Sequence, residues 1–337
     1  MVLNGNAKAV TESVIRELGE VVDGESVFVS QSTEQSRFIA RTLIHRRYDV
    51  VFCGGGDGTF SRVVSDVLAL APERPPRFGI LRLGTGNALA TSLGASRASS
   101  AGLASDLKLA RDPAAQVQLP LLQVEADQVA PFAGFGLDAL ILEDYNALKH
   151  RLQGTPLAAL GQGAAGYALS VAGRSLWRFM LEPLPVLTVR NLGAPARRID
   201  LRGRPLGPAI PAGGLLYHGP AAIAAASTIP YYGLGLRLFP QADGRADRFQ
   251  LRVGTVGALK LVSQLPALFR GELVDERIFD FFCTAISIRC DEPQALQIGG
   301  DQVGRRRQLT VRLRQVPAVA RHRRRDQLTP PPLQLLA

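Results

Sequence analysis

The sequence predicts an α/β domain with a parallel sheet and helices on both faces, followed by an all-β, sandwich-like domain with inserted helices. Over residues 1–115, short apolar segments alternate with helical segments, and this alternation implies a parallel sheet. From residue 116 onward, short runs of alternating polarity are separated by turns rich in Gly and Pro, which is typical of antiparallel sandwiches. A chain of 337 residues is long enough for two domains with complete cores.

In the first domain, residues 1–115, strands and helices are expected to follow one another along the chain. The clearest helix comes after the third strand, where Phe60, Val63, Val64, Val67 and Leu68 recur at the spacing of one helix face. In chain order we expect strand 1–6, helix 9–18, strand 26–30, a helix around 38–43, strand 50–53, helix 60–68, strand 78–83 and helix 103–111.

The second domain, residues 116–318, is expected to be built mainly from strands. Two longer helical patterns interrupt it, at 157–179 and 256–269. Residues 319–337 are basic and then rich in Pro, which favours a disordered tail. The expected strands cover 117–124, 186–189, 236–239, 249–253, 285–288 and 309–313.

Positive charge is concentrated near the end of the chain. The net charge is +10, and nine arginines without an acidic residue lie in the run Arg305–Arg325. Such a run suits an anionic membrane surface, although a solvated strand face with a disordered tail remains an equal alternative. No aromatic residues interleave the run, so we expect no specific nucleic-acid partner.

The remaining composition narrows the class of protein. The first residues lack the apolar segment of a signal peptide, and no uninterrupted apolar run reaches the roughly 18 residues of a membrane span. Three scattered cysteines favour a reducing compartment and have no zinc-site spacing. We therefore expect a cytoplasmic protein.

The run Gly54-Gly-Gly-Asp57-Gly58 separates the third strand from its helix. Its glycines let the backbone approach a ligand closely, and the free N–H groups of the following helix suit phosphate. Thr59 excludes two common phosphate loops, one of which needs Lys after the last glycine and the other a third glycine. A glycine-rich turn capped by Asp and Thr is the structural alternative.

A second loop, Gly84-Thr-Gly-Asn87, follows the next strand. The carboxyl ends of parallel strands meet at one edge of a sheet, and ligands bind there. The loops Asn4–Asn6 and Ser32-Thr33 end strands at the same edge. The sequence therefore predicts a nucleotide cleft.

The ordered pair Gly-Gly-Asp-Gly-Thr59 and Gly-Thr-Gly-Asn-Ala-Leu-Ala90 resembles the diacylglycerol kinase catalytic-domain superfamily. That group contains bacterial diacylglycerol and other lipid kinases, sphingosine and ceramide kinases and, more distantly, NAD kinases. The resemblance implies ATP-dependent, Mg²⁺-assisted transfer of a phosphoryl group to a diacylglycerol-like or sphingoid lipid at the inner membrane face. It also implies that the last strands return toward the first domain.

The resemblance assigns nucleotide contacts to the loop residues. Thr33 and Asn87 have a structural alternative, because each could cap a helix. The loop near Asn4 lacks the Pro and Ser of the family's first motif. The expected nucleotide-binding residues are Asn4, Thr33, Gly54, Gly55, Gly56, Asp57, Gly58, Thr59, Gly84, Thr85, Gly86 and Asn87.

The resemblance places the acceptor site in the second domain. Gly136 and Asp138 match a segment beside the family's lipid cleft, with a purely structural turn as an equal alternative. Asp57 and Asp301 are the expected catalytic residues, and a turn aspartate is the structural alternative for Asp301. Asp301 matches the aspartate of an Asp-Gly-Glu motif, but Gln302 and Val303 replace the other two residues. If the missing Glu is the base, the rate falls by ~10²–10⁴ or activity is lost.

Two further aspartates correspond to the family's structural magnesium site. Aligned without gaps, the motif's aspartate falls on Ala246, and Asp243 and Asp247 lie beside it as the candidate ligands.

Two other functions stay open. One is an NAD kinase-like enzyme, which the second motif disfavours. The other is a nucleotide- or lipid-binding protein without activity, motivated by Val303. The identity of the lipid and the oligomeric state, a homodimer included, are left open.

Overall fold

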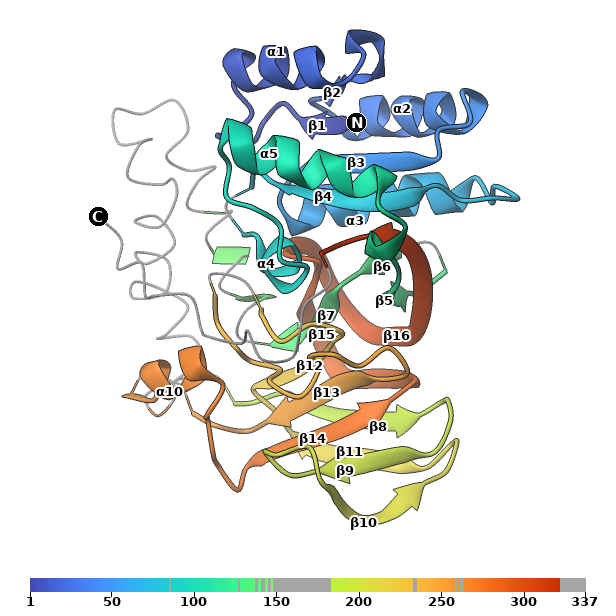
Figure 1. Cartoon of the computed structure of the whole chain (residues 1–337). Helices are drawn as coiled ribbons and strands as arrows, with labels where there is room; N and C mark the ends of the chain where they lie inside the picture. The colour runs from blue at the N-terminus through green and yellow to red at the C-terminus, as the bar shows by residue number, and fades with distance from the viewer. Residues whose placement is uncertain are drawn as a thin grey trace.

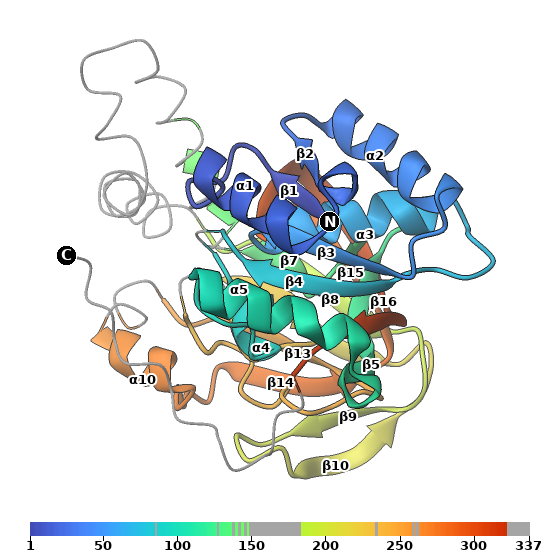
Figure 2. The same cartoon turned by 45° about the horizontal axis from the view of Figure 1, so that its top comes forward.

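The computed structural model describes residues 1–84, 86–126, 128–136, 139–140, 143–144, 147, 183–232, 235–257, 260 and 263–321. The fold has an α/β region at the N-terminus and a β-rich region after it, shown in two orientations (Figures 1 and 2). Within the described part of the chain, no helix is both long enough and apolar enough to cross a bilayer.

The α/β region is a parallel sheet in the order β4-β3-β1-β2. Alternate strand side chains point to opposite faces. Val51 packs in one core with α2 and α3, whereas Phe52 packs in another with α1 and α5. The elements are β1 Val2–Asn4, α1 Glu12–Val21, β2 Phe28–Ser30, α2 Thr33–His45, β3 Val50–Gly55, α3 Asp57–Ala69, β4 Arg77–Arg82, α4 Ala88–Ser92 and α5 Ser100–Leu107.

The β-rich region is antiparallel, apart from one parallel contact with the first region. Its core contains the buried Phe135, Phe249 and Phe281. The strands are β5 Gln116–Val124, β6 Gln128–Ala130, β7 Phe132–Gly136, β8 Val186–Asn191, β9 Ala196–Ile199, β10 Pro205–Ile210, β11 Leu215–Pro220, β12 Ile223–Ser227, β13 Phe249–Gly254, β14 Ile278–Cys283, β15 Ala285–Ile298 and β16 Asp301–Val319, with the short helix α10 Leu265–Arg270 before β14.

The strand β16 joins the two regions. It pairs with β15 at its start and with β5 over Val311–Val319, and Ala318 lies beside Phe78 of β4 in parallel register. The figures show β16 where the regions meet (Figures 1 and 2). The last strand thus fixes the β15–β16 turn relative to the α/β sheet.

Several boundaries differ from the sequence prediction. Residues 236–239, expected to form a strand, have an irregular backbone and pair with no strand. Phe239 is instead buried against Tyr232, with 5.3 Å between the ring centroids. The expected tail begins later than residue 319: Ala320 donates its N–H to Ala115, and Arg321 is bound to Asp106. The helix expected at 157–179 lies outside the described residues, and α10 is what they contain of the helix expected at 256–269.

Candidate active site

The two glycine-rich loops lie against each other, backbone on backbone. A β-carbon placed on Gly84 would lie 2.2 Å from the Cα of Gly56, so no larger residue fits there without moving the loop. The N–H of Asp57 donates to the carbonyl of Gly86 at 3.3 Å. The sequence placed these loops at one edge of the sheet, and the structure brings them into direct contact.

Asp57 binds the second loop rather than projecting into open space. Its carboxylate accepts hydrogen bonds from the N–H groups of Ala88 at 2.9 Å and Leu89 at 2.8 Å. These are the first two residues of α4, so Asp57 supplies that helix with the cap that Asn87, at the N-cap position, does not make. Asp57 is 4% exposed. Burial raises its pKa to about 7, and the two N–H groups limit the rise.

Asn87 closes its own loop. Its Oδ1 accepts from the N–H of Gly84 at 3.1 Å, and its Nδ2 donates to the carbonyl of the same residue. The side chain therefore holds the turn Gly84–Asn87 in shape. Its expected cap contact with α4 is absent, because Asp57 occupies that position.

Two other predicted residues lie at the ends of neighbouring strands. The Nδ2 of Asn4, at the end of β1, donates to Oγ1 of Thr59 at 3.0 Å, which links the first strand to the glycine-rich loop. Thr33 is exposed and is the first residue of α2. The N-cap of α2 is Ser32, and the Ser32 Oγ accepts a hydrogen bond from the N–H of Gln35 at 3.2 Å. The predicted cap role of Thr33 is therefore wrong by one residue.

Asp301 lies at the first turn of α3. A β-carbon placed on Gly58 would lie 2.8 Å from its Oδ2. The turn before it uses Gly299 and Gly300, with φ of 60° and 92°, in the left-handed region that glycine tolerates. A β-carbon on Gly299 would meet the Oγ of Ser61 at 2.7 Å, so the turn is held against α3. This packing places the Asp301 carboxylate against the glycine-rich loop at Gly58.

The environment of Asp301 changes its acidity. Asp301 is exposed as a residue, but the packing of its carboxyl against the first turn of α3 removes part of its water and raises its pKa above the usual range, and the positive charge of Arg62 opposes the rise. Val303 packs against the apolar core of the β-rich region. Within the turn segment 299–303, Asp301 is thus the acidic side chain that is available at the loop.

Of the two residues predicted to line the acceptor site, Gly136 and Asp138, the structure describes only Gly136. Gly136 ends β7 and pairs with Ile223 of β12. Asp138 and Thr85 lie outside the described residues.

The predicted magnesium ligands do not fit a metal site. The Oδ2 of Asp243 is buried without a hydrogen-bond partner, but the Arg237 guanidinium lies 3.9 Å away and supplies the positive charge that a metal ion would bring. Asp247 is exposed and pairs with Arg248 at 3.2 Å. Within the described ranges, no three metal-ligating side chains are grouped.

The arginine run is divided by the structure. Within β16, Arg305 binds Glu143 at 2.9 Å and Arg307 lies 3.4 Å from Glu292. Arg321, which was expected in the tail, binds the buried Asp106 at 2.8 Å. Arg323, Arg324 and Arg325 lie outside the described residues. Part of the predicted membrane-binding charge is therefore neutralised within the fold.

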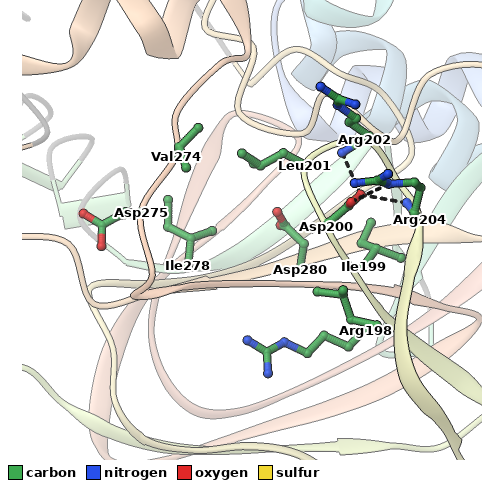
Figure 3. Close-up of a pocket in the computed structure, with 11 residues that line it drawn as sticks. Arg198, Ile199, Asp200, Leu201, Arg202, Arg204, Val274, Asp275, Ile278 and Asp280 are labelled. Carbon is green, nitrogen blue, oxygen red and sulfur yellow. Dashed lines mark hydrogen bonds and ion pairs between the residues drawn. The ribbon is translucent and has the colours of Figure 1, made fainter.

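A pocket of about 440 Å³ lies far from the loops, between the β9–β10 hairpin and the segment 274–280 (Figure 3). Its three carboxylates each have a cationic partner at 2.7–2.8 Å: Asp200 pairs with Arg204, Asp275 with Lys260 and Asp280 with Arg252. The three carboxylates are therefore neutralised within the fold by ion pairs. The pocket supplies none of the groups that face the glycine-rich loops.

The two glycine-rich loops and Asp301 thus lie together at one edge of the parallel sheet. Residues 3–117 match the diacylglycerol kinase catalytic domain. The match confirms the resemblance predicted from the two motifs, and the matched part of the chain is called the kinase-type domain below. No curated protein matches the chain.

Solved structures extend the likeness to the second region. A candidate diacylglycerol kinase from Bacillus anthracis strain Sterne has a TM-score of 0.64 and 15% identity, with 95% of this chain and 94% of that chain covered. A diacylglycerol kinase from the same strain has a TM-score of 0.58 and 13% identity, with 95% of each chain covered. At this identity the likeness concerns the fold, and it confirms the predicted two-region architecture.

Sequence reasoning missed two features of the site. The first is the cap that Asp57 gives to α4, which no local pattern indicates because the partners belong to different loops. The second is Arg62, whose charge acts on Asp301. The sequence could have predicted this, because Arg62 lies four residues after Gly58 and residues four apart share a helix face.

Proposed function

We propose that the chain is an ATP-dependent lipid kinase, with the hydroxyl of a diacylglycerol-like or sphingoid lipid as the acceptor. The observation that carries the proposal is the position of Asp301 against Gly58, at the N-terminal turn of the kinase-type domain's α3. Phosphoryl transfer needs a cradle for the phosphates and a group that accepts the proton of the hydroxyl. The glycine-rich loop and Asp301 provide these two parts side by side.

In the proposed reaction, backbone N–H groups of the loop Gly55–Thr59 hold the terminal phosphates of ATP. Mg²⁺ arrives with ATP as part of the substrate and reduces the charge of the phosphates. The acceptor oxygen forms a bond to the γ-phosphorus while the bond to the β–γ bridging oxygen breaks. Asp301 takes the hydroxyl proton, and ADP and the phosphorylated lipid leave.

Asp57 has a different task in this proposal. Its carboxylate is occupied by Ala88 and Leu89, so it joins the two loops and keeps the cradle in shape. We therefore assign proton transfer to Asp301 and the positioning of the loops to Asp57.

The second candidate is a nucleotide-binding protein that transfers nothing. Val303 favours it, because this residue packs into the apolar core where the resembling motif has a second acid. The two candidates share the nucleotide cradle and differ in whether Asp301 alone supports transfer.

The deciding experiment measures transfer of label from γ-labelled ATP, with Mg²⁺, to a panel of detergent-dispersed lipids, followed by extraction into organic solvent. A labelled lipid that disappears with Asp301→Asn would support the kinase. ATP binding without any labelled lipid would support the binding protein instead. Formation of NADP from NAD and ATP would overturn both.

A further inference from the structure

Arg62 lies where the helix α3 faces Asp301. Gly58 and Arg62 are four residues apart on α3, so they share one face of the helix. The carboxylate of Asp301 fills the space beside Gly58 that a side chain would otherwise take. Helical side chains lean toward the N-terminus of their helix, and this brings the Arg62 guanidinium toward the same point.

Arg62 is not used in holding the fold. Its side chain is exposed, and within the described residues it has no hydrogen bond and no ion pair within 4.0 Å, including with Asp301. Its charge is nevertheless near enough to Asp301 to act on the acidity of that carboxyl. All of its planar N–H donors are therefore available to a ligand, and such donors match phosphate oxygens in pairs.

We propose that Arg62 binds the phosphoryl group that is transferred, one helical turn after the glycine-rich loop, and so extends the cradle around it. This inference rests on the proposed kinase function and adds a catalytic residue to it. The transferred group then contacts both the backbone N–H groups of the loop and the Arg62 guanidinium of the same helix, with the acceptor hydroxyl at Asp301. An arginine so placed stabilises the charge that develops on the equatorial oxygens during transfer.

The first test compares the affinities of ATP and ADP by calorimetry, without any lipid. Arg62→Gln should weaken ATP binding about tenfold or more and leave ADP binding within about twofold, because ADP lacks the contacted phosphate. Arg62→Lys should restore part of the loss, since it keeps the charge but not the fork. The control is Arg41→Gln, which removes an exposed arginine of α2 and should change neither affinity.

The second test follows the titration of the Asp301 carboxyl by NMR in the free protein. Arg62→Gln should raise the pKa of Asp301, because the nearby positive charge that favours the carboxylate is gone. The acid limb of the pH–rate profile should shift to higher pH by the same amount. A general change in folding would move the two nucleotide affinities together and would show in the thermal melt.

The outcomes separate the inference from the function on which it rests. Wild type that binds ATP and ADP, with an Arg62→Gln variant that keeps their affinity ratio, would overturn the role of Arg62 and leave the kinase standing. Wild type that binds neither nucleotide would overturn both. Loss of ATP binding without a change in ADP binding, together with the higher pKa, would establish the contact.

Discussion

The carboxylate of Asp301 stands where a side chain at position 58 would be, 2.8 Å from the β-carbon that Gly58 lacks. Two segments far apart in the chain therefore share one small space, at the start of α3 and in the turn between β15 and β16. The absence of a side chain at Gly58 lets the acid approach the helix N-terminus.

Gly58→Ala should displace Asp301 and reduce turnover while leaving the nucleotide in place. The added methyl group would overlap Oδ2, and the carboxylate must turn away from the acceptor hydroxyl. We expect kcat to fall by ~10²-fold and ATP affinity to change little. Steady-state kinetics and calorimetry on the same preparation check this, and an unchanged kcat would show that Asp301 does not act from this position.

Asp301→Asn should abolish the pH dependence of turnover on its acid side. A general base must be deprotonated, and partial desolvation beside α3 raises the pKa of the Asp301 carboxyl, so the wild-type rate should fall as the pH drops through that raised value. The variant should lose ~10²–10⁴ in rate. A pH–rate profile of kcat/KM measures both effects; an acid limb that persists in the variant would assign it to another group.

Asp57→Ala should lower stability rather than remove a reacting group. It leaves the N–H groups of Ala88 and Leu89 buried and unpaired, for a loss of about 2–4 kcal/mol. Denaturant unfolding measures the loss. Reduced turnover of Asp57→Ala at a temperature where it is fully folded, with intact ATP binding, would instead point to a direct chemical role.

Stability should fall as the pH rises from about 4 to 7 because of Asp57. Its pKa is raised from 3.8 to about 7 on folding, so the folded protein binds this proton more tightly than the unfolded chain. The protonated Asp57 stabilises the fold fully when the pH is below 3.8, the pKa of this group in the unfolded chain. This contribution to the free energy of unfolding, at most about 4 kcal/mol, is lost as the pH rises to about 7, the pKa in the folded protein. Asp57→Asn should not show this slope in denaturant unfolding at a series of pH values.

Gly84→Ala should break the contact between the two loops. The new β-carbon would lie 2.2 Å from Cα and 2.3 Å from N of Gly56, which are backbone atoms and cannot turn aside. We expect lower ATP affinity and a stability loss of about 1–3 kcal/mol. The matched control is Gly19→Ala in α1, where the added carbon meets nothing within 4 Å and stability should rise by up to about 1 kcal/mol.

Arg312 and Arg314 of β16, which have no ion pair within the part of the chain that the structure describes, should contribute to binding of anionic vesicles. Arg312→Gln with Arg314→Gln should weaken partitioning into vesicles that contain phosphatidylglycerol by about 30-fold, at roughly 1 kcal/mol per charge. Added salt should weaken wild-type binding. Co-sedimentation with neutral phosphatidylcholine vesicles serves as the control. Equal binding of wild type and variant would place the contact elsewhere or show that the run is a solvated strand face.

The sequence by itself determined the alternation of strands and helices, the parallel sheet and the two glycine-rich loops at one of its edges. These features depend on local periodicity and on the conformational freedom of short glycine runs, which neighbouring residues reveal. The strand expected at 236–239 is wrong, because the burial of Phe239 depends on side chains from other segments and not on local periodicity.

Only the tertiary structure shows which groups the acids at this edge contact. Asp57 looked catalytic in the sequence, but its partners are the N–H groups of a helix in the other loop. Asp301 lies beside the first turn of α3, near Arg62, because the last strand, β16, pairs with both regions and fixes the turn before it against α3. Contacts between segments so distant in the chain leave no local pattern, and the packing that creates them exists only in the folded protein.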